Sequence, residues 1–396
     1  MSSPAIANTS PSPASLGELF PKVTIARLLI AWAVVIAFQI GGASWLAEPI
    51  SPVVAIVCFV VLFATILTAA FGVVREADHL AHQLGEPYGT LILTLSIVSI
   101  EVILIAAVML GPGEAPTIGR DSIFAVMMII LNLVTGICLL VGGLRYGEQE
   151  YNAQGALAYV SMTVLLTGTA LVLPNTLSTG NGTFWPAQAV AFAAFTVVLY
   201  GAFLLMQMRG YRRLFMQPEP GALSISVQKG SGQDAGAAHP KSVLDTRGNI
   251  IRSITLVGMM LPIILLAHDL AILIDHGIEL AGAPVALGGV LIAIIVFTPE
   301  SITAIKAALR NEMQRAVNLC LGAFVSTVGL TVPAVLVVGL VTGKTVVLGI
   351  TPTETVLLLL TIGLTAFTFL GQRTSAVQGL MHLMLFAVFS VLLFVS

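Results

Sequence analysis

Two glutamates, Glu101 and Glu300, stand inside long apolar stretches of the sequence. Glu101 lies in the middle of VSIEVILI (98–105), and Glu300 lies in VFTPESIT (296–303). A carboxylate is costly to bury in an apolar setting unless it is paired, protonated or bound to a metal ion. Carboxylate oxygens suit hard cations such as Ca²⁺, and the same oxygens also accept protons. The two glutamates therefore predict a site at which a cation and a proton compete.

Groups beside the two glutamates could supply more oxygen ligands to a cation. Pro299 cannot donate to the carbonyl of Ile295, so we expect a helix break that frees backbone carbonyls beside Glu300. The alternative is a structural pair of protonated glutamates, each hydrogen-bonded to a neighbouring helix. The nearby hydroxyl groups that could line a cavity belong to Thr94, Ser99, Thr298 and Ser301.

The composition is that of a membrane protein. The 396 residues are 57% hydrophobic and 9% charged, and the mean hydropathy is +1.01, whereas soluble domains carry about 25% charged residues. The apolar runs are long and continuous, which predicts an all-α polytopic membrane protein and excludes a β-barrel. The net charge of −2 suggests no nucleic-acid partner. Cys58, Cys138 and Cys320 lie in apolar runs and are expected to be buried, without a disulfide or metal role.

Eleven stretches are long enough to span a bilayer, which needs about 20 apolar residues. The predicted spans are 25–46, 53–74, 91–110, 122–144, 156–175, 187–208, 250–275, 285–306, 316–340, 353–371 and 377–395. They divide the chain into a disordered cytoplasmic tail (1–24), a first transmembrane helix (25–52), a first repeat (53–208), a cytoplasmic linker (209–249) and a second repeat (250–396).

Lysine and arginine predict the orientation of these spans. When the central linker is placed in the cytoplasm, all seventeen basic residues except Arg120 and Lys344 fall on the cytoplasmic side, as positive charge does in membrane proteins. The N-terminus would then be cytoplasmic and the C-terminus outside. Because each repeat has five spans, the second repeat is inverted relative to the first, which is a common plan of secondary transporters. Such symmetry would bring Glu101 and Glu300 together near mid-depth.

Other polar residues in the spans are candidates for the same pathway. Asn132, Ser326 and Thr327 could line the cavity, although Asn132 could equally form a hydrogen bond between helices. His268 and Asp269 could form a proton relay or a buried pair that faces neighbouring helices. The polar segment 75–87 could collect cations or protons at the inner mouth, or it could simply be a solvated helix face.

Three segments resemble a known family. GEPYGTLILTLSIVSIEVILI (85–105) and the stretch from VFTPESIT to VPAVL (296–336) resemble the two alpha-repeats of the calcium/cation antiporter superfamily. They are most similar to its bacterial ChaA-type calcium or sodium (potassium) to proton antiporters, as is NLVTGICLLVGGLRYGEQEYN (132–152). The resemblance implies that Glu101 and Glu300 bind the transported cation and exchange it for protons.

The expected protein is thus a secondary antiporter of the bacterial inner membrane. It would export Ca²⁺, Na⁺ or K⁺ in exchange for H⁺ by alternating access, with small inorganic cations, protons and the lipid bilayer as its partners and no organic cofactor. Asparagines common in this superfamily are replaced by Val98 and Phe297, so the physiological cation stays open, as do the stoichiometry and oligomeric state. The alternatives are a proton-uncoupled cation channel that uses the same carboxylates and an intramembrane enzyme. The sequence contains no Walker A, H-E-x-x-H or nucleophile-elbow motif, so neither an ATP-driven pump nor an enzyme is expected.

Overall fold

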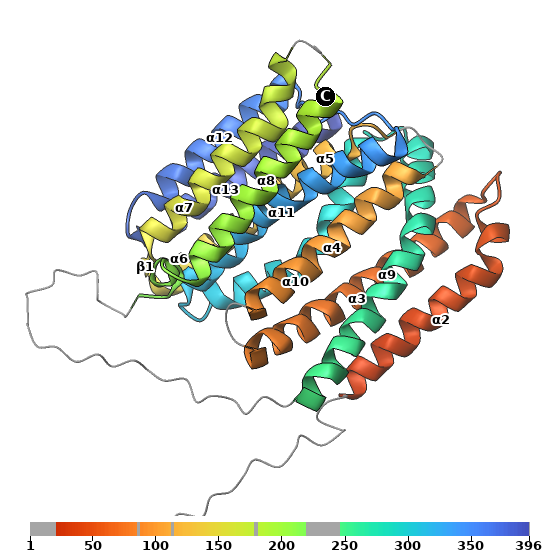
Figure 1. Ribbon diagram of the computed structural model, residues 1–396, viewed down its shortest axis with the longest axis horizontal. Coiled ribbons are helices and arrows are strands. Elements are labelled where there is room, and N and C mark those ends of the chain that lie inside the picture. The colour runs from red at the N-terminus through yellow and green to blue at the C-terminus, as the bar shows by residue number, and fades with distance from the viewer. Residues whose placement is uncertain (1–20, 85–87, 112–114, 178–180, 219–245, 396) are drawn as a thin grey trace, which may run out of the picture.

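The protein is a bundle of long helices. The computed structural model describes residues 21–84, 88–111, 115–177, 181–218 and 246–395 (Figure 1). Within these ranges, 10 helical spans are long and apolar enough to cross a membrane, and Thr94–Leu110 adds a shorter apolar helix. The all-α polytopic class is confirmed, and each of the predicted spans coincides with one helix or with one run of consecutive helical segments.

The first half of the chain contains a leading helix and five spans, two of which change helix type along their length. The elements are α2 (Lys22–Trp45), α3 (Pro52–Leu84), α4 (Tyr88–Leu110), α5 (Ile118–Met127), the π-helix η1 (Met128–Val134), α6 (Thr135–Tyr146), β1 (Gln149–Glu150), α7 (Ala153–Thr167), the π-helix η2 (Gly168–Val172), the 3₁₀ helix η3 (Leu173–Thr176) and α8 (Pro186–Met208). α5, η1 and α6 together form one span, and α7, η2 and η3 form the next.

The second half contains five spanning helices, and its described residues include no π-helical segment. The elements are the 3₁₀ helix η4 (Arg212–Phe215), α9 (Thr246–Ala281), α10 (Ala286–Ala308), α11 (Met313–Thr342), α12 (Pro352–Phe369), β2 (Arg373–Thr374) and α13 (Ala376–Val395). β2 pairs with β1 in an antiparallel two-stranded sheet at one end of the bundle.

Two polar segments are more helical than the expected span boundaries suggest. α3 continues to Leu84, well beyond the predicted end at residue 74, because READHLAHQL contains no glycine or proline to stop it. α9 begins at Thr246 and pairs with this extension, since Arg252 forms a buried salt bridge of 3.1 Å with Glu76.

The described ends of the predicted linker are also ordered. Residues 219–245 lie outside the described ranges, as do residues 1–20 of the predicted tail. The described part before residue 219 docks on the bundle, because the amide of Asn318 donates to the carbonyl of Phe215 in η4 at 2.7 Å. The described residues at both ends of the predicted linker are therefore part of the folded bundle.

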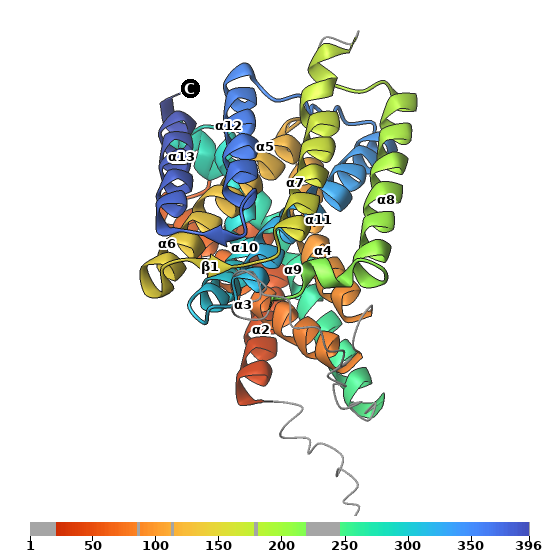
Figure 2. The same ribbon diagram turned by 90° about the vertical axis from the view of Figure 1, so that its left-hand side faces the viewer.

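The helix contacts repeat between the two halves of the bundle. α3 packs against α9, and α7 packs against α12. Three further sets of contacts come in matched pairs: α4 on α9 and α10 on α3, α10 on α5 and α4 on α11, α8 on α11 and α13 on α6. This pattern of contacts is expected if an approximate two-fold axis relates α3–α8 to α9–α13. Such an axis relates the two halves of the predicted inverted repeat. Both views place α2, α3 and α9 on one side of the bundle and α12 and α13 on the other (Figures 1 and 2).

Glycines set the closest helix crossings around the centre. A Cβ added to Gly289 of α10 would lie 2.6 Å from backbone atoms of Asp121 and Ser122 in the α5 span. A Cβ on Gly379 of α13 would lie 2.6 Å from the backbone nitrogen of Leu140. Small residues allow such close backbone approach in membrane helices. The first crossing fixes the position of α10, which carries Glu300.

Candidate functional site

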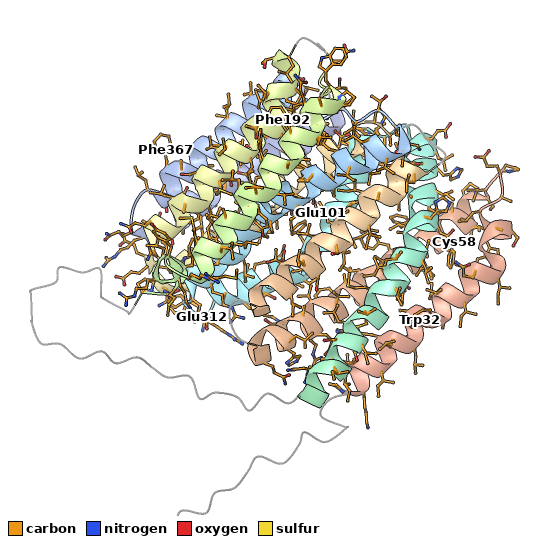
Figure 3. The ribbon with its side chains drawn as sticks, viewed as in Figure 1. Trp32, Cys58, Glu101, Phe192, Glu312 and Phe367 are labelled. Atoms are coloured by element: carbon orange, nitrogen blue, oxygen red, sulfur yellow. The ribbon has the colours of Figure 1, made fainter. Side chains whose placement is uncertain are left out.

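Glu101 lies at the middle of α4, fully buried near the centre of the bundle (Figure 3). Its Oε2 accepts a hydrogen bond of 3.0 Å from the hydroxyl of Thr327 on α11. Thr331, one turn further along α11, is also fully buried and lies beside the same carboxylate. Oε1 of Glu101 is buried without a hydrogen-bond partner in the described part of the chain. The Glu101 side chain is therefore held by α11 of the other half, and its second carboxylate oxygen has no partner among the described residues.

Glu300 lies at the wall of a cavity of about 620 Å³. The cavity runs between α3, α4, α8, α10 and α11. Oε2 of Glu300 is buried and, among the described residues, has no hydrogen-bond partner. Glu300 is close enough to Glu101 for the two carboxylates to interact electrostatically, and α4 and α10 are in contact. The predicted juxtaposition of the two glutamates is therefore present in the structure.

Within the described residues, no basic side chain pairs with either of the two glutamates. The salt bridges within the described ranges join other residues, and none includes Glu101 or Glu300. Three buried oxygens in this region also lack hydrogen-bond partners: Glu101 Oε1, Glu300 Oε2 and Thr331 Oγ1. Buried polar groups normally have hydrogen-bond partners, so buried groups without one mark positions that can bind an ion or water or serve another function. Carboxylate and hydroxyl oxygens are suited to a hard cation, and the carboxylates can otherwise be neutralised by protons.

The sequence of the chain matches a known family of membrane exchangers. The family model described as "Sodium/calcium exchanger protein" matches residues 54–209 and 253–395, which is most of the chain. The chain belongs to this sodium/calcium exchanger family. It is 33% identical to the sodium-potassium/proton antiporter ChaA of Escherichia coli (strain K12) over 362 residues, which cover 91% of this chain and 94% of that protein. The chain is thus a transmembrane antiporter of this family, one of secondary transporters rather than ATP-driven enzymes.

Solved structures show the same fold at lower sequence identity. The structure of native YfkE superposes with a TM-score of 0.69 at 19% identity, and the match covers 93% of this chain and all of the YfkE chain. The H⁺/Ca²⁺ exchanger CAX gives a TM-score of 0.65 at 15% identity, with coverage of 94% of this chain and 89% of the CAX chain. At this level of identity, the similarity establishes the architecture of the exchanger family and nothing further.

The expected helix break at Pro299 is wrong, because α10 is one continuous helix from Ala286 to Ala308. Two hydroxyl groups near the proline bond to backbone carbonyls of the same helix. Thr298 Oγ1 donates to the carbonyl of Ile294 at 2.5 Å, and Thr303 Oγ1 donates to that of Pro299 at 3.0 Å. Neither bond replaces the one that the proline removes, because the carbonyl left without its helical donor is that of Ile295. The strong irregularity lies instead in the first half, where η1 is π-helical.

The structure divides the predicted cavity-lining hydroxyls into two groups. Thr94 and Ser326 line the cavity, and Thr327 binds Glu101 directly. The other hydroxyls do not line the cavity and instead donate to carbonyls one turn earlier in their own helices: Ser99 to Leu95, Thr298 to Ile294, and Ser301 to Phe297. Proximity in sequence to a glutamate therefore predicted the site hydroxyls less well than position on the facing helix α11 did.

Asn132 does not line the cavity. It belongs to a fully buried network that joins η1 to α12 and α13. Its Nδ2 donates to Thr361 Oγ1 at 3.0 Å, and its Oδ1 lies 3.3 Å from Nδ1 of His382. Nε2 of His382 lies 3.1 Å from the hydroxyl of Thr368. Because Asn132 Oδ1 can only accept, the network is satisfied when His382 carries its proton on Nδ1. The helix–helix alternative is therefore the correct one for Asn132.

His268 and Asp269 are not part of the cavity. His268 is exposed on the surface of α9, and Asp269 is half-buried near Cys58 of α3. Neither residue lines the cavity that reaches Glu300. The structure therefore does not connect the proposed relay to the two glutamates. The three cysteines are buried and free, as expected.

Sequence reasoning missed Tyr200 of α8, which is buried at the wall of the cavity. Its phenol group lies beside Thr94 and Ser326 and near Glu300. The ring packs directly on α11 because Gly329 has no side chain: a Cβ there would lie 2.7 Å from Cγ of Tyr200. A tyrosine in an otherwise apolar span could have marked Tyr200 as a candidate in the sequence. The sequence around it does not show that α8 covers the site.

Proposed function

We propose that this protein exchanges a cation for protons at Glu101 and Glu300 by alternating access. The observation that carries the proposal is a pair of interacting carboxylates at the contact between the two halves, without a basic partner in the described part of the chain. Charged groups inside a membrane cost about 2.5–3.5 kcal/mol each on insertion scales, so they are retained for function and face a pathway. Cation and proton would neutralise the same pair in turn, which couples their movements.

The accessibility of the two ends of the bundle supports alternating access. The cavity reaches Glu300 from the end of the bundle that carries Arg75 and Lys306. The other end is held by contacts between the two halves. Lys344 Nζ donates to the carbonyl of Met109 at 2.6 Å, and Arg120 donates to that of Gly349 at 3.1 Å. A cavity that reaches Glu300 from one end of the bundle corresponds to one of the two states that such a cycle requires.

We place the open end on the cytoplasmic side of a bacterial inner membrane, since the predicted topology puts all lysines and arginines except Arg120 and Lys344 on that side. The N-terminus would be cytoplasmic and the C-terminus outside. The proton gradient would drive export of Ca²⁺, Na⁺ or K⁺. The relatives support this range of cations, because they include a sodium-potassium/proton antiporter and a Ca²⁺/H⁺ antiporter of Aphanothece halophytica that is 26% identical over 217 residues.

The test uses everted membrane vesicles that have been energised to acidify the lumen and that contain a ΔpH-sensitive dye. NaCl, KCl and CaCl₂ are added in turn to wild type, Glu101→Gln and Glu300→Gln. We expect at least one salt to dissipate the proton gradient in the wild type and in neither variant. Cation movement without proton movement would indicate a channel. Variants that behave like the wild type would show that the two carboxylates take no part in the exchange.

A further inference from the structure

The cavity that reaches Glu300 has a strongly basic entrance. Apart from Glu300 itself, Asp78 is the one acidic residue among the described residues that line it. We call the four basic residues of the lining the basic mouth: Arg75, Arg212, Lys306 and Arg315. An entrance of this sign is unexpected in front of a cation site, because it repels the ions that must pass it.

Part of this positive charge is not compensated nearby. Arg315 pairs with Glu312 at 3.3 Å, and both Asp78 and Arg212 make interactions of their own. In contrast, no ion pair to Arg75 or Lys306 is present among the residues that the structure describes. Both of these side chains are exposed, as expected of groups that face water in the cavity.

The nearest acidic and basic neighbours of Arg75 do not cancel its charge. Glu76, the next residue, points its carboxylate to Arg252 in a buried salt bridge of 3.1 Å. Arg27 of α2 lies close enough to Arg75 to interact with it, and it adds positive charge. The mouth as described is therefore net positive.

We propose that the basic mouth is a charge filter that favours monovalent over divalent cations on their way to Glu101 and Glu300. This inference rests on the proposed antiport at that pair. The local concentration of an ion in a positive potential falls exponentially with its charge, so the factor for a divalent ion is the square of that for a monovalent ion. A mouth that depletes Na⁺ about three-fold depletes Ca²⁺ about nine-fold.

The filter acts on entry and not on ion binding by the carboxylates. It therefore changes the cation concentration that gives half-maximal rate, and it leaves the maximal rate unchanged. Because the basic side chains are exposed, salt screens them, and the Debye length falls from about 30 Å at 0.01 M to about 8 Å at 0.15 M ionic strength. The filter is strongest at low ionic strength.

The test compares Lys306→Glu with Arg310→Glu in the full-length protein. Lys306 lines the cavity, whereas Arg310 is equally exposed one turn later and does not line it. Initial rates of proton movement are measured in everted vesicles against Na⁺, K⁺ and Ca²⁺, at low ionic strength and again after addition of an inert organic salt. Ca²⁺ is measured as a substrate or, if it moves no protons, as a competitor of Na⁺.

We expect Lys306→Glu to lower KM for Na⁺ and K⁺ about two- to three-fold, and KM or Ki for Ca²⁺ by the square of that factor, about four- to nine-fold. The maximal rate should not change, both effects should shrink at high ionic strength, and Arg310→Glu should match the wild type. Equal factors for the two classes of ion, no change in Lys306→Glu, or the same change in Arg310→Glu would overturn the filter. A wild type in which no cation moves protons would refute the proposed function itself, and the filter with it.

Discussion

Thr327→Val tests the contact that holds Glu101. The Thr327 hydroxyl donates to Glu101 Oε2 at 3.0 Å, and Oε1 has no partner in the described part of the chain. Valine replaces the hydroxyl with a methyl group of similar size. The substitution leaves the carboxylate without its one observed hydrogen bond. We expect the charged form of Glu101, which binds the cation, to lose more stabilisation than the protonated form.

The magnitude follows from the difference between these two forms. A hydrogen bond to a charged group contributes about 1.5–3 kcal/mol and one to a neutral group about 1 kcal/mol. The difference of about 0.5–2 kcal/mol corresponds to roughly a 2- to 30-fold change in an equilibrium constant. KM for the cation should rise by this factor, and the rise should be larger at low pH, where protons compete more strongly for the pair.

The assay is cation-dependent proton movement in everted vesicles at two pH values. Thr327→Ser keeps a hydroxyl and should stay close to the wild type. Thr365→Val is the matched control, since Thr365 is also buried but donates to the carbonyl of Thr361, away from the glutamates. An unchanged KM in Thr327→Val, or an equal increase in Thr365→Val, would refute the reasoning.

Further predictions concern the packing and accessibility of the site. Gly289→Ala should destabilise the protein by about 1–3 kcal/mol, visible as a lower Tm in detergent, because its new Cβ would meet the α5 backbone. His382→Phe should cost about 1–3 kcal/mol for each of the two hydrogen-bond partners left unsatisfied, again measured as Tm, with exchange activity retained in the folded fraction. In a variant without native cysteines, Ser326→Cys should react with a membrane-impermeant maleimide from the cavity side, whereas Thr327→Cys should not.

Each of these predictions has an outcome that contradicts it. Gly363→Ala is the control for the glycine substitution, because no atom lies within 4 Å of a Cβ added there; equal effects of the two substitutions would mean that the crossing with α5 is not tight. A His382→Phe variant as stable as the wild type would show that the network is not needed for stability. Equal labelling of residues 326 and 327 would disagree with the cavity lining.

The sequence was sufficient for the spans and for the pair of glutamates. The length of the apolar runs alone located the spans, because a bilayer imposes a minimum length on every helix that crosses it. The five-span halves predicted an inverted repeat, and the symmetric contacts of α4 with α11 and of α10 with α5 agree with it. The juxtaposition of Glu101 and Glu300 followed from that symmetry and from the cost of burying carboxylates.

The details of the site depended on tertiary packing that no local pattern reveals. A proline inside an apolar run predicted a break, but α10 continues through Pro299 as one helix. The sequence left Asn132 either in the cavity or in a hydrogen bond between helices, because its partner His382 lies 250 positions away in sequence. The hydroxyls nearest to Glu300 in sequence bond to their own helix, whereas Thr327 reaches Glu101 across the bundle.

The most direct measurement of the central claim is proton release on cation binding. Purified protein in weakly buffered detergent solution receives the cation that moves protons in vesicles, and a pH indicator records the protons released. Cation and proton occupy the same two carboxylates in this account, so the wild type should release protons with a saturable dependence on cation concentration, and Glu101→Gln/Glu300→Gln should release none. Equal release from the double variant, or cation binding to the wild type without proton release, would contradict the shared site.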